Sequence, residues 1–388
     1  MAETRASFRG WLHDKVDVLR EHHPRIHGAI RTAVYQTLTR ALPGAPAYAQ
    51  QRFGLRRYES GQGWQAPTTA PATPATPATP ATPAASVTAA ASANPAGPDR
   101  VVLLVHGLDE PGAIWARTAP ALEVGGHHVM RIEYPNDQAI DASARFLADQ
   151  LRALRADGVD RVDLVTHSMG GLVARDALTR DDAYAGQTTG HDDLPDIHQL
   201  IMVAPPNQGS HWAHFRGFLE LREHASAILA GRWHAEELVV HGDGQAGRDL
   251  VPGSDYLQSL NARPLPRPVD ITIIAGQFLP DRLLRQPVSP AFRDGLGDGV
   301  VSLTSTRLPD AQAAERVVET EVAGVAGARV THRVMPGHHR TLLTSSALAS
   351  GRQTWAGLTG GRVDSPLPPA VPVILDRLAH EGRTSRWR

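Results

Sequence analysis

Cysteine is absent from this chain of 388 residues. Its absence excludes disulfides, thiolate metal sites and a cysteine nucleophile, so covalent catalysis would have to use another side chain. An excess of charge of one sign is also missing, because the net charge is -1. A nucleic-acid partner is therefore not expected, since a clear excess of positive charge attracts such partners.

Long apolar runs are missing as well. No stretch approaches the roughly 20 consecutive apolar residues of a membrane-spanning helix. Residues 1–9 contain no apolar core of the kind that signal peptides have. We therefore expect a cytoplasmic protein. The composition, 41% hydrophobic and 20% charged, is typical of a globular chain that forms one large domain or two ordinary ones.

A Pro-Ala-Thr repeat at residues 71–83 divides the chain. The surrounding stretch, 66–98, consists mainly of Ala, Thr, Ser and Pro, which cannot bury apolar area, so a disordered linker is predicted. Residues 1–65 are predicted to be an amphipathic helical segment, and residues 99–388 are predicted to be a catalytic domain.

Two stripes of apolar residues at helical spacing support the N-terminal prediction. They are Phe8, Leu12, Val16 and Leu19, and then Ile26, Ile30, Val34, Leu38 and Ala41. One interpretation is a helical hairpin that docks on the main domain or on a partner chain. The other is attachment to a membrane surface through Arg25, Arg31 and Arg40. Residues 1–42 are thus expected to contact a protein or, peripherally, a membrane.

Apolar runs alternate with helical periodicity in the catalytic part. Strands are predicted at 100–106, 128–134, 161–167, 198–203, 269–275 and 330–334. A helix is predicted over Trp115–Leu122, and Asp137 is predicted to cap another. The apolar stripe of that second helix is Ile140, Ala144, Leu147, Leu151 and Leu154. Such alternation implies a mostly parallel sheet with helices on both faces, whose ligands bind at the carboxyl ends of the strands.

The strongest sign of function lies between Arg161 and Arg175. An apolar strand leads into a tight turn with Ser168 at its apex, and helical spacing follows. Small residues flank the serine at Thr166, where glycine is commonest, and at Gly170. Strand, turn and helix in this order are typical of a nucleophile elbow, which presents a serine hydroxyl above the sheet.

A serine nucleophile needs donors for the oxyanion. The turn after the first strand of the catalytic part presents the amide of Leu108, and the residue after the serine presents the amide of Met169. His106, which precedes the turn, is expected to form structural hydrogen bonds.

The serine also needs a base and an acid. His338 and His339 both follow the last strand, and His339 is preferred because Leu342 and Leu343 then begin a buried helix. For the acid, the candidates are Asp281, Asp294, Asp298 and Asp310. Asp298 is preferred because its glycine-flanked turn leads into an apolar stretch, and Asp294 is the second choice. The chain order Ser, Asp, His is that of α/β-hydrolases.

Paired histidines occur at 22–23, 127–128 and 338–339. None stands at a recognised ligand spacing such as H-E-x-x-H, so neither a metal nor a cofactor is expected.

Six segments in order make residues 99–350 resemble the bacterial lipase/esterase branch of the α/β-hydrolase superfamily. They are residues 105–108, 166–171, 204–210, 249–261, 297–301 and 337–343. The resemblance implies a mostly parallel central sheet with helices on both faces and a lid or cap insertion. It also implies hydrolysis of carboxylic esters, often of lipids, by Ser168, Asp298 and His339.

An insertion of high apolar content is predicted over residues 206–266. One interpretation is a packed cap helix; the other is a lid whose inner face lines an acyl pocket. In the second case Trp212, Phe215 and Phe218 are the substrate-binding candidates.

Two alternatives to an esterase or lipase remain open. An acyltransferase would use the same triad and pass the acyl group to an alcohol or amine. A catalytically silent binding protein could share the same fold, because a fold does not determine a function.

Overall fold

The structure is a computed structural model. It describes residues 53–66, 98, 100–108, 112–210, 244–278, 294–308, 319–323, 329–344 and 367–384. The two predicted N-terminal helices, most of the predicted linker and the three predicted substrate-binding aromatic residues lie outside the described residues, as do Asp281 and Asp310. None of the described helices is long and apolar enough to cross a bilayer.

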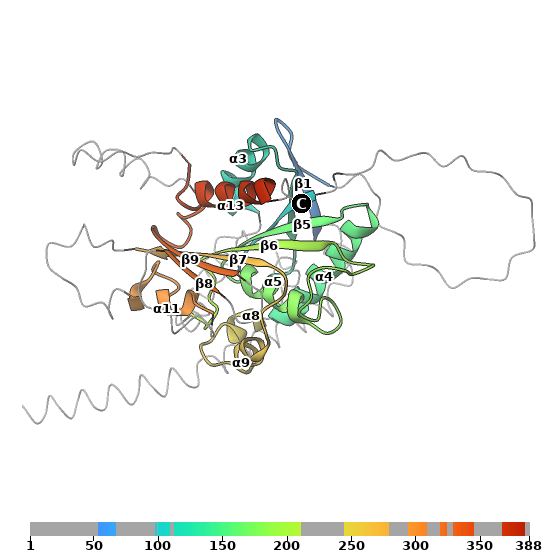
Figure 1. The fold of residues 1–388 in the computed structure, drawn as a ribbon. Helices are drawn as coiled ribbons and strands as arrows, with labels where there is room; N and C mark the ends of the chain where they lie inside the picture. Colours follow the sequence, from blue (N-terminus) through green and yellow to red (C-terminus); the bar gives the residue numbers. More distant parts are fainter. Residues whose placement is uncertain are drawn as a thin grey trace, which may run out of the picture.

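A twisted sheet forms the centre of the described part of the chain, with nine strands in the order β2-β1-β4-β3-β5-β6-β7-β9-β8 (Figure 1). The strands are β1 (Gly54–Glu59), β2 (Gly63–Gln65), β3 (Arg100–Val105), β4 (Val129–Glu133), β5 (Arg161–His167), β6 (Asp196–Val203), β7 (Asp270–Gln277), β8 (Glu319–Ala323) and β9 (Arg329–Pro336). The six strands β4-β3-β5-β6-β7-β9 are parallel to one another. Antiparallel strands close both edges.

The central strands are buried on both faces. All residues of β3 after Arg100 and all residues of β5 after Arg161 are buried. A parallel sheet covered on both sides selects mainly apolar strands, and the buried Asp163 of β5 accepts from Arg100 over 2.7 Å. The predicted parallel arrangement is therefore confirmed.

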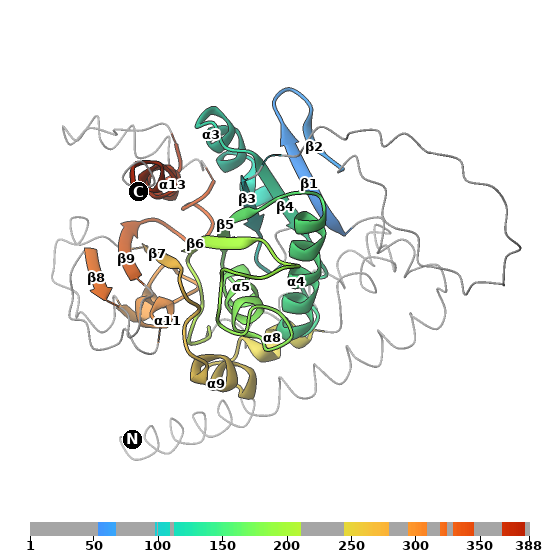
Figure 2. The ribbon, with the colours of Figure 1, turned by 45° about the vertical axis from the view of Figure 1, so that its right-hand side comes forward.

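Helices cover the two faces of the sheet (Figure 2). On one face lie α3 (Thr118–Val124), which follows the short η1 (Ala113–Trp115), and α13 (Ala370–Thr384). On the other lie α4 (Ile140–Ala156) and α5 (Gly170–Thr179). Each pair packs into its own apolar cluster, so the sheet separates two cores. The chain also forms α8 (Gln245–Asp249), α9 (Asp255–Ala262) and α11 (Leu303–Thr306).

The start of α4 differs from the prediction. Its predicted apolar stripe is buried, but Ala139, not Asp137, is the N-cap residue, and it makes no side-chain cap. The amide of Ile140 instead donates to Asp249 Oδ2 over 2.9 Å. An acceptor more than a hundred residues away supplies the cap, so the local sequence carries no sign of it.

The N-terminal boundary also needs correction. Residues 54–65, which were assigned to a helical segment, form the hairpin β1-β2, and β1 pairs with β4. The ring of Trp64 covers the guanidinium of Arg131 at 4.4 Å and packs edge to face on Tyr58. The central sheet therefore begins before the Pro-Ala-Thr repeat, and the stretch after residue 66 connects two strands of one sheet.

Candidate active site

Ser168 lies between the end of β5 and the start of α5 in a left-handed backbone conformation, with φ 51°. Its amide donates to the carbonyl of Val203 at the end of β6 over 2.9 Å. Few non-glycine residues adopt this conformation, and the surrounding structure must enforce it. The turn thus has the geometry of a nucleophile elbow.

Close packing explains the residues around the serine. A side chain at Gly170 would place Cβ 2.5 Å from the carbonyl oxygen of Val105, so this position must lack one. A Cβ at Gly171 would lie 3.3 Å from Thr166 Oγ1. The threonine that replaces the commonest elbow glycine is therefore accommodated because the facing helix position is a glycine.

The turn after β3 lies directly against the serine. A Cβ on Gly107 would meet Ser168 Cβ at 2.8 Å and Ser168 Oγ at 3.4 Å. The neighbouring residue Leu108 is buried, as is Met169, which is the N-cap residue of α5. Both backbone segments that were predicted to supply oxyanion donors thus flank the serine.

Tyr134 holds this turn in place. Its hydroxyl donates to the carbonyl of His106 over 2.6 Å, and the two rings stack with centroids 4.4 Å apart. Burial raises the pKa of Tyr134 far above its ordinary value, so the phenol stays a neutral donor. His106 Nδ1 lies 2.8 Å from the carbonyl oxygen of Gly107. These contacts give His106 a structural position.

Asp298 and His339 form a buried pair. His339 Nδ1 lies 2.8 Å from Asp298 Oδ2, and the amide of His339 donates to the carbonyl of Asp298 over 3.1 Å. The other carboxylate oxygen, Oδ1, accepts from the amides of Val300 and Val301 over 2.9 and 2.8 Å. Burial alone would raise the pKa of Asp298, but the charge and hydrogen bond of His339 and the two amides outweigh it and hold the pKa below its usual range.

The two histidines after β9 occupy different surroundings. His339 is buried on Asp298, whereas the half-buried His338 packs edge to face on the exposed Phe278, with ring centroids 5.8 Å apart. Burial is the main cause that lowers the pKa of His338, and the charge of Asp298 opposes it. Asp294, the second choice for the acid, is half-buried ahead of the turn that carries Asp298.

His167 connects the elbow to the segment that carries His339. Its Nε2 lies 3.2 Å from the carbonyl oxygen of His339, and the two rings lie 4.8 Å apart at 50°. Because a carbonyl only accepts, Nε2 carries the proton in this contact. Sequence reasoning missed this residue, although its place next to Ser168 was a signal.

Arg175, also missed, is buried on the helix behind the serine. It donates to Asn207 Oδ1 and Asn261 Oδ1, each over 3.0 Å. Asn207 in turn donates to the carbonyl of Thr306 over 2.7 Å. One guanidinium thus joins both described ends of the predicted insertion to α5, and through Asn207 to α11.

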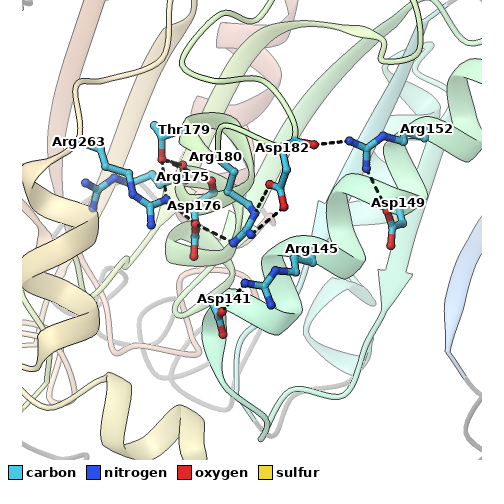
Figure 3. Close-up of polar contacts among 10 residues, drawn as sticks. All are labelled: Asp141, Arg145, Asp149, Arg152, Arg175, Asp176, Thr179, Arg180, Asp182 and Arg263. Atoms are coloured by element: carbon cyan, nitrogen blue, oxygen red, sulfur yellow. Dashed lines mark hydrogen bonds and ion pairs between the residues drawn. The ribbon is translucent and has the colours of Figure 1, made fainter.

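Next to Arg175, the carboxylate of Asp176 forms ion pairs with further arginines (Figure 3). Asp176 is fully buried and pairs with Arg263 at 2.6 Å and with Arg180 at 3.6 Å. The hydrogen bond to Asp182 is the main cause that raises the pKa of Arg180. The buried carboxylate of Asp176 is therefore paired both along its own helix and with the segment that follows α9.

Comparison with known proteins gives one family. A model of the alpha/beta hydrolase family matches residues 102–350. No curated protein sequence matches the chain. Solved structures that it resembles include the Bacillus licheniformis lipase BlEst2, with 18% identity, TM-score 0.41 and coverage of 69% of this chain and 92% of that chain. Lipase 1 from Pelosinus fermentans has 14% identity, TM-score 0.45 and coverage of 67% and 98%. Carboxylesterase CesB from Bacillus subtilis has 13% identity, TM-score 0.38 and coverage of 87% and 99%.

Proposed function

The chain belongs to the alpha/beta hydrolase family, and on that premise we propose that it is a serine hydrolase that cleaves carboxylic esters. One observation carries the proposal. A histidine bonded through Nδ1 to a buried carboxylate packs its ring against His167, the residue that precedes a serine on a left-handed elbow. Lipid or other acyl esters are the substrate class that we propose.

Ser168 is the proposed nucleophile. As its Oγ attacks the ester carbonyl carbon, His339 Nε2 accepts the hydroxyl proton and the carbonyl oxygen becomes an oxyanion. The amides of Leu108 and Met169 stabilise that charge, each by about 10²- to 10³-fold in turnover. The imidazolium then protonates the leaving alcohol, and an acyl-enzyme remains on Ser168.

Asp298 is the proposed acid. Its carboxylate holds the proton of His339 on Nδ1, so that Nε2 is free to accept one from the serine, and it stabilises the imidazolium that forms. Its pKa below the usual range keeps it ionised at neutral pH. Water then attacks the acyl-enzyme with the same base, and the acid product and free serine result. This scheme requires neither a metal nor a cofactor.

Hydrolysis of short p-nitrophenyl esters tests the nucleophile. Ser168→Ala should remove turnover while the protein stays folded, because alanine keeps the Cβ of serine and lacks only the hydroxyl. Labelling of wild type with a fluorophosphonate, followed by peptide mapping, should place the adduct on Ser168. Full activity of the alanine variant would refute the proposal.

The base is tested by two matched substitutions. His339→Ala should cost as much turnover as the serine change, since triad members act as a unit. His338→Ala should retain most activity, because the ring of His338 packs on Phe278 and the proposed acid, Asp298, is bonded to His339. The reverse order of effects would assign the base to His338.

A further inference from the structure

Ser210 ends the first described stretch of the predicted insertion, and its hydroxyl contacts the turn that carries Asp298. Ser210 Oγ donates to the carbonyl of Val300 over 2.6 Å. That carbonyl and the amide of Val301 are the two ends of one peptide unit. The amide end donates to Asp298 Oδ1 over 2.8 Å.

A continuous chain of donors therefore runs from Ser210 through this peptide to Oδ1 of Asp298, whose other oxygen, Oδ2, accepts from His339. A peptide is planar, so a hydrogen bond that fixes its carbonyl also fixes the direction of its N–H. Hydrogen bonds in such a chain also polarise one another, so the bond at one end strengthens the donor at the other.

The backbone of Ser210 is fixed as well. Its amide donates to the carbonyl of Leu250 over 2.9 Å. The preceding Gly209 has φ 90°, and a Cβ there would lie 2.7 Å from the nitrogen of Pro252. Ser210 is only 7% exposed. The hydroxyl thus comes from a rigid point at which the two described ends of the insertion meet.

We infer that Ser210 is a positioning residue for Asp298, and that it connects the insertion to the acid of the triad. The inference rests on the proposed function. Ser210 acts through the Val300–Val301 peptide: its hydrogen bond keeps the amide directed at Oδ1 and leaves Oδ2 for His339.

Ser210→Ala tests the inference. It should lower kcat for a p-nitrophenyl ester about three- to tenfold, the rate equivalent of one hydrogen bond, with KM unchanged. Labelling of Ser168 by a fluorophosphonate should slow by the same factor. Ser210→Thr keeps the hydroxyl and should restore both rates.

Thr188→Val is the matched control. Thr188 is also buried, and its hydroxyl donates to the carbonyl of Pro268 over the same 2.6 Å. It lies beside Ile197 at the amino ends of the parallel strands, whereas the proposed triad lies at their carboxyl ends. This variant should lose thermal stability comparable to that of Ser210→Ala and keep the wild-type kcat. All rates are measured where melting curves show every variant folded.

The outcomes separate the inference from the proposed function. If wild type is active and labelled at Ser168 but Ser210→Ala has the wild-type kcat, the inference alone is wrong. An equal fall in kcat for Thr188→Val would also overturn it, because the effect would then follow general stability. If wild type neither hydrolyses esters nor accepts the label, the proposed function fails and the inference falls with it.

Discussion

Replacement of Asp298 by asparagine should separate folding from catalysis. Asparagine has nearly the same shape as aspartate, but one of its two terminal groups is a donor. In the wild type, Oδ1 accepts from the amides of Val300 and Val301, and Oδ2 accepts from His339 Nδ1. The effect of Asp298→Asn depends on which of these positions receives the NH₂ group.

The two backbone amides decide the orientation. An NH₂ group facing them would leave two donors without acceptors in a buried site, at a cost of roughly 1–3 kcal/mol each. The amide oxygen therefore stays on Val300 and Val301, and the NH₂ group faces His339. Only an unprotonated Nδ1 can accept from it, so the proton of the imidazole moves to Nε2.

A base with its proton on Nε2 cannot accept one from Ser168. We expect Asp298→Asn to lower kcat by about 10³- to 10⁴-fold, while the backbone hydrogen bonds keep the turn folded. Initial rates on p-nitrophenyl esters, with melting curves of the same samples, measure the two effects. Asp294→Asn is the control and should stay within a factor of a few of wild type. More than a tenth of wild-type turnover in Asp298→Asn would refute the reasoning.

Two further predictions concern packing and pH. Gly107→Ala should lower kcat by about 10²-fold, because its Cβ would lie 2.8 Å from Ser168 Cβ and displace the serine, whereas Gly247→Ala, with nothing within 4 Å, should leave kcat unchanged. An unaltered kcat in the first variant would contradict the close approach. Burial, with the charge of Arg307, lowers the pKa of His332 to about 4, so the unfolded chain binds this proton more readily. The contribution of the neutral His332 to the free energy of unfolding should therefore be fully present above the unfolded pKa of about 6.5. It should fall as the pH drops toward 4, by up to roughly 3 kcal/mol in total. Urea midpoints at pH 7 and pH 5 measure the loss, and His332→Gln should reduce it; an equal slope in both proteins would count against this assignment.

Local patterns were enough for the central strands and the elbow. Buried parallel strands are rich in apolar residues, and β3 has a continuous run of them, whereas β5 has Val162, Leu164 and Val165 around the buried Asp163. The elbow needs small residues at fixed offsets from Ser168, and Gly170 and Gly171 stand there. These features are readable because each depends on neighbours within one turn or one strand.

Contacts between residues far apart in the chain could not be predicted from the sequence. The cap of α4 comes from Asp249, and the hairpin of residues 54–65 pairs with β4 across the Pro-Ala-Thr repeat. A three-residue strand such as β2 carries too short a pattern to stand out from an adjacent helical prediction. The repeat itself was read as a boundary between domains, because composition indicates a lack of packing but not what the ends of a segment pair with.

The two adjacent histidines illustrate the same limit at the site. Their order in the sequence says nothing about which ring faces Asp298, because the direction of each ring depends on how the chain turns after β9. The carbonyl of Asp298 accepts from the amide of His339, and this bond sets that turn. His167 contacts the carbonyl of His339 from the other side. Both contacts join residues far apart in the chain, so a choice between His338 and His339 needs the fold as well as the motif.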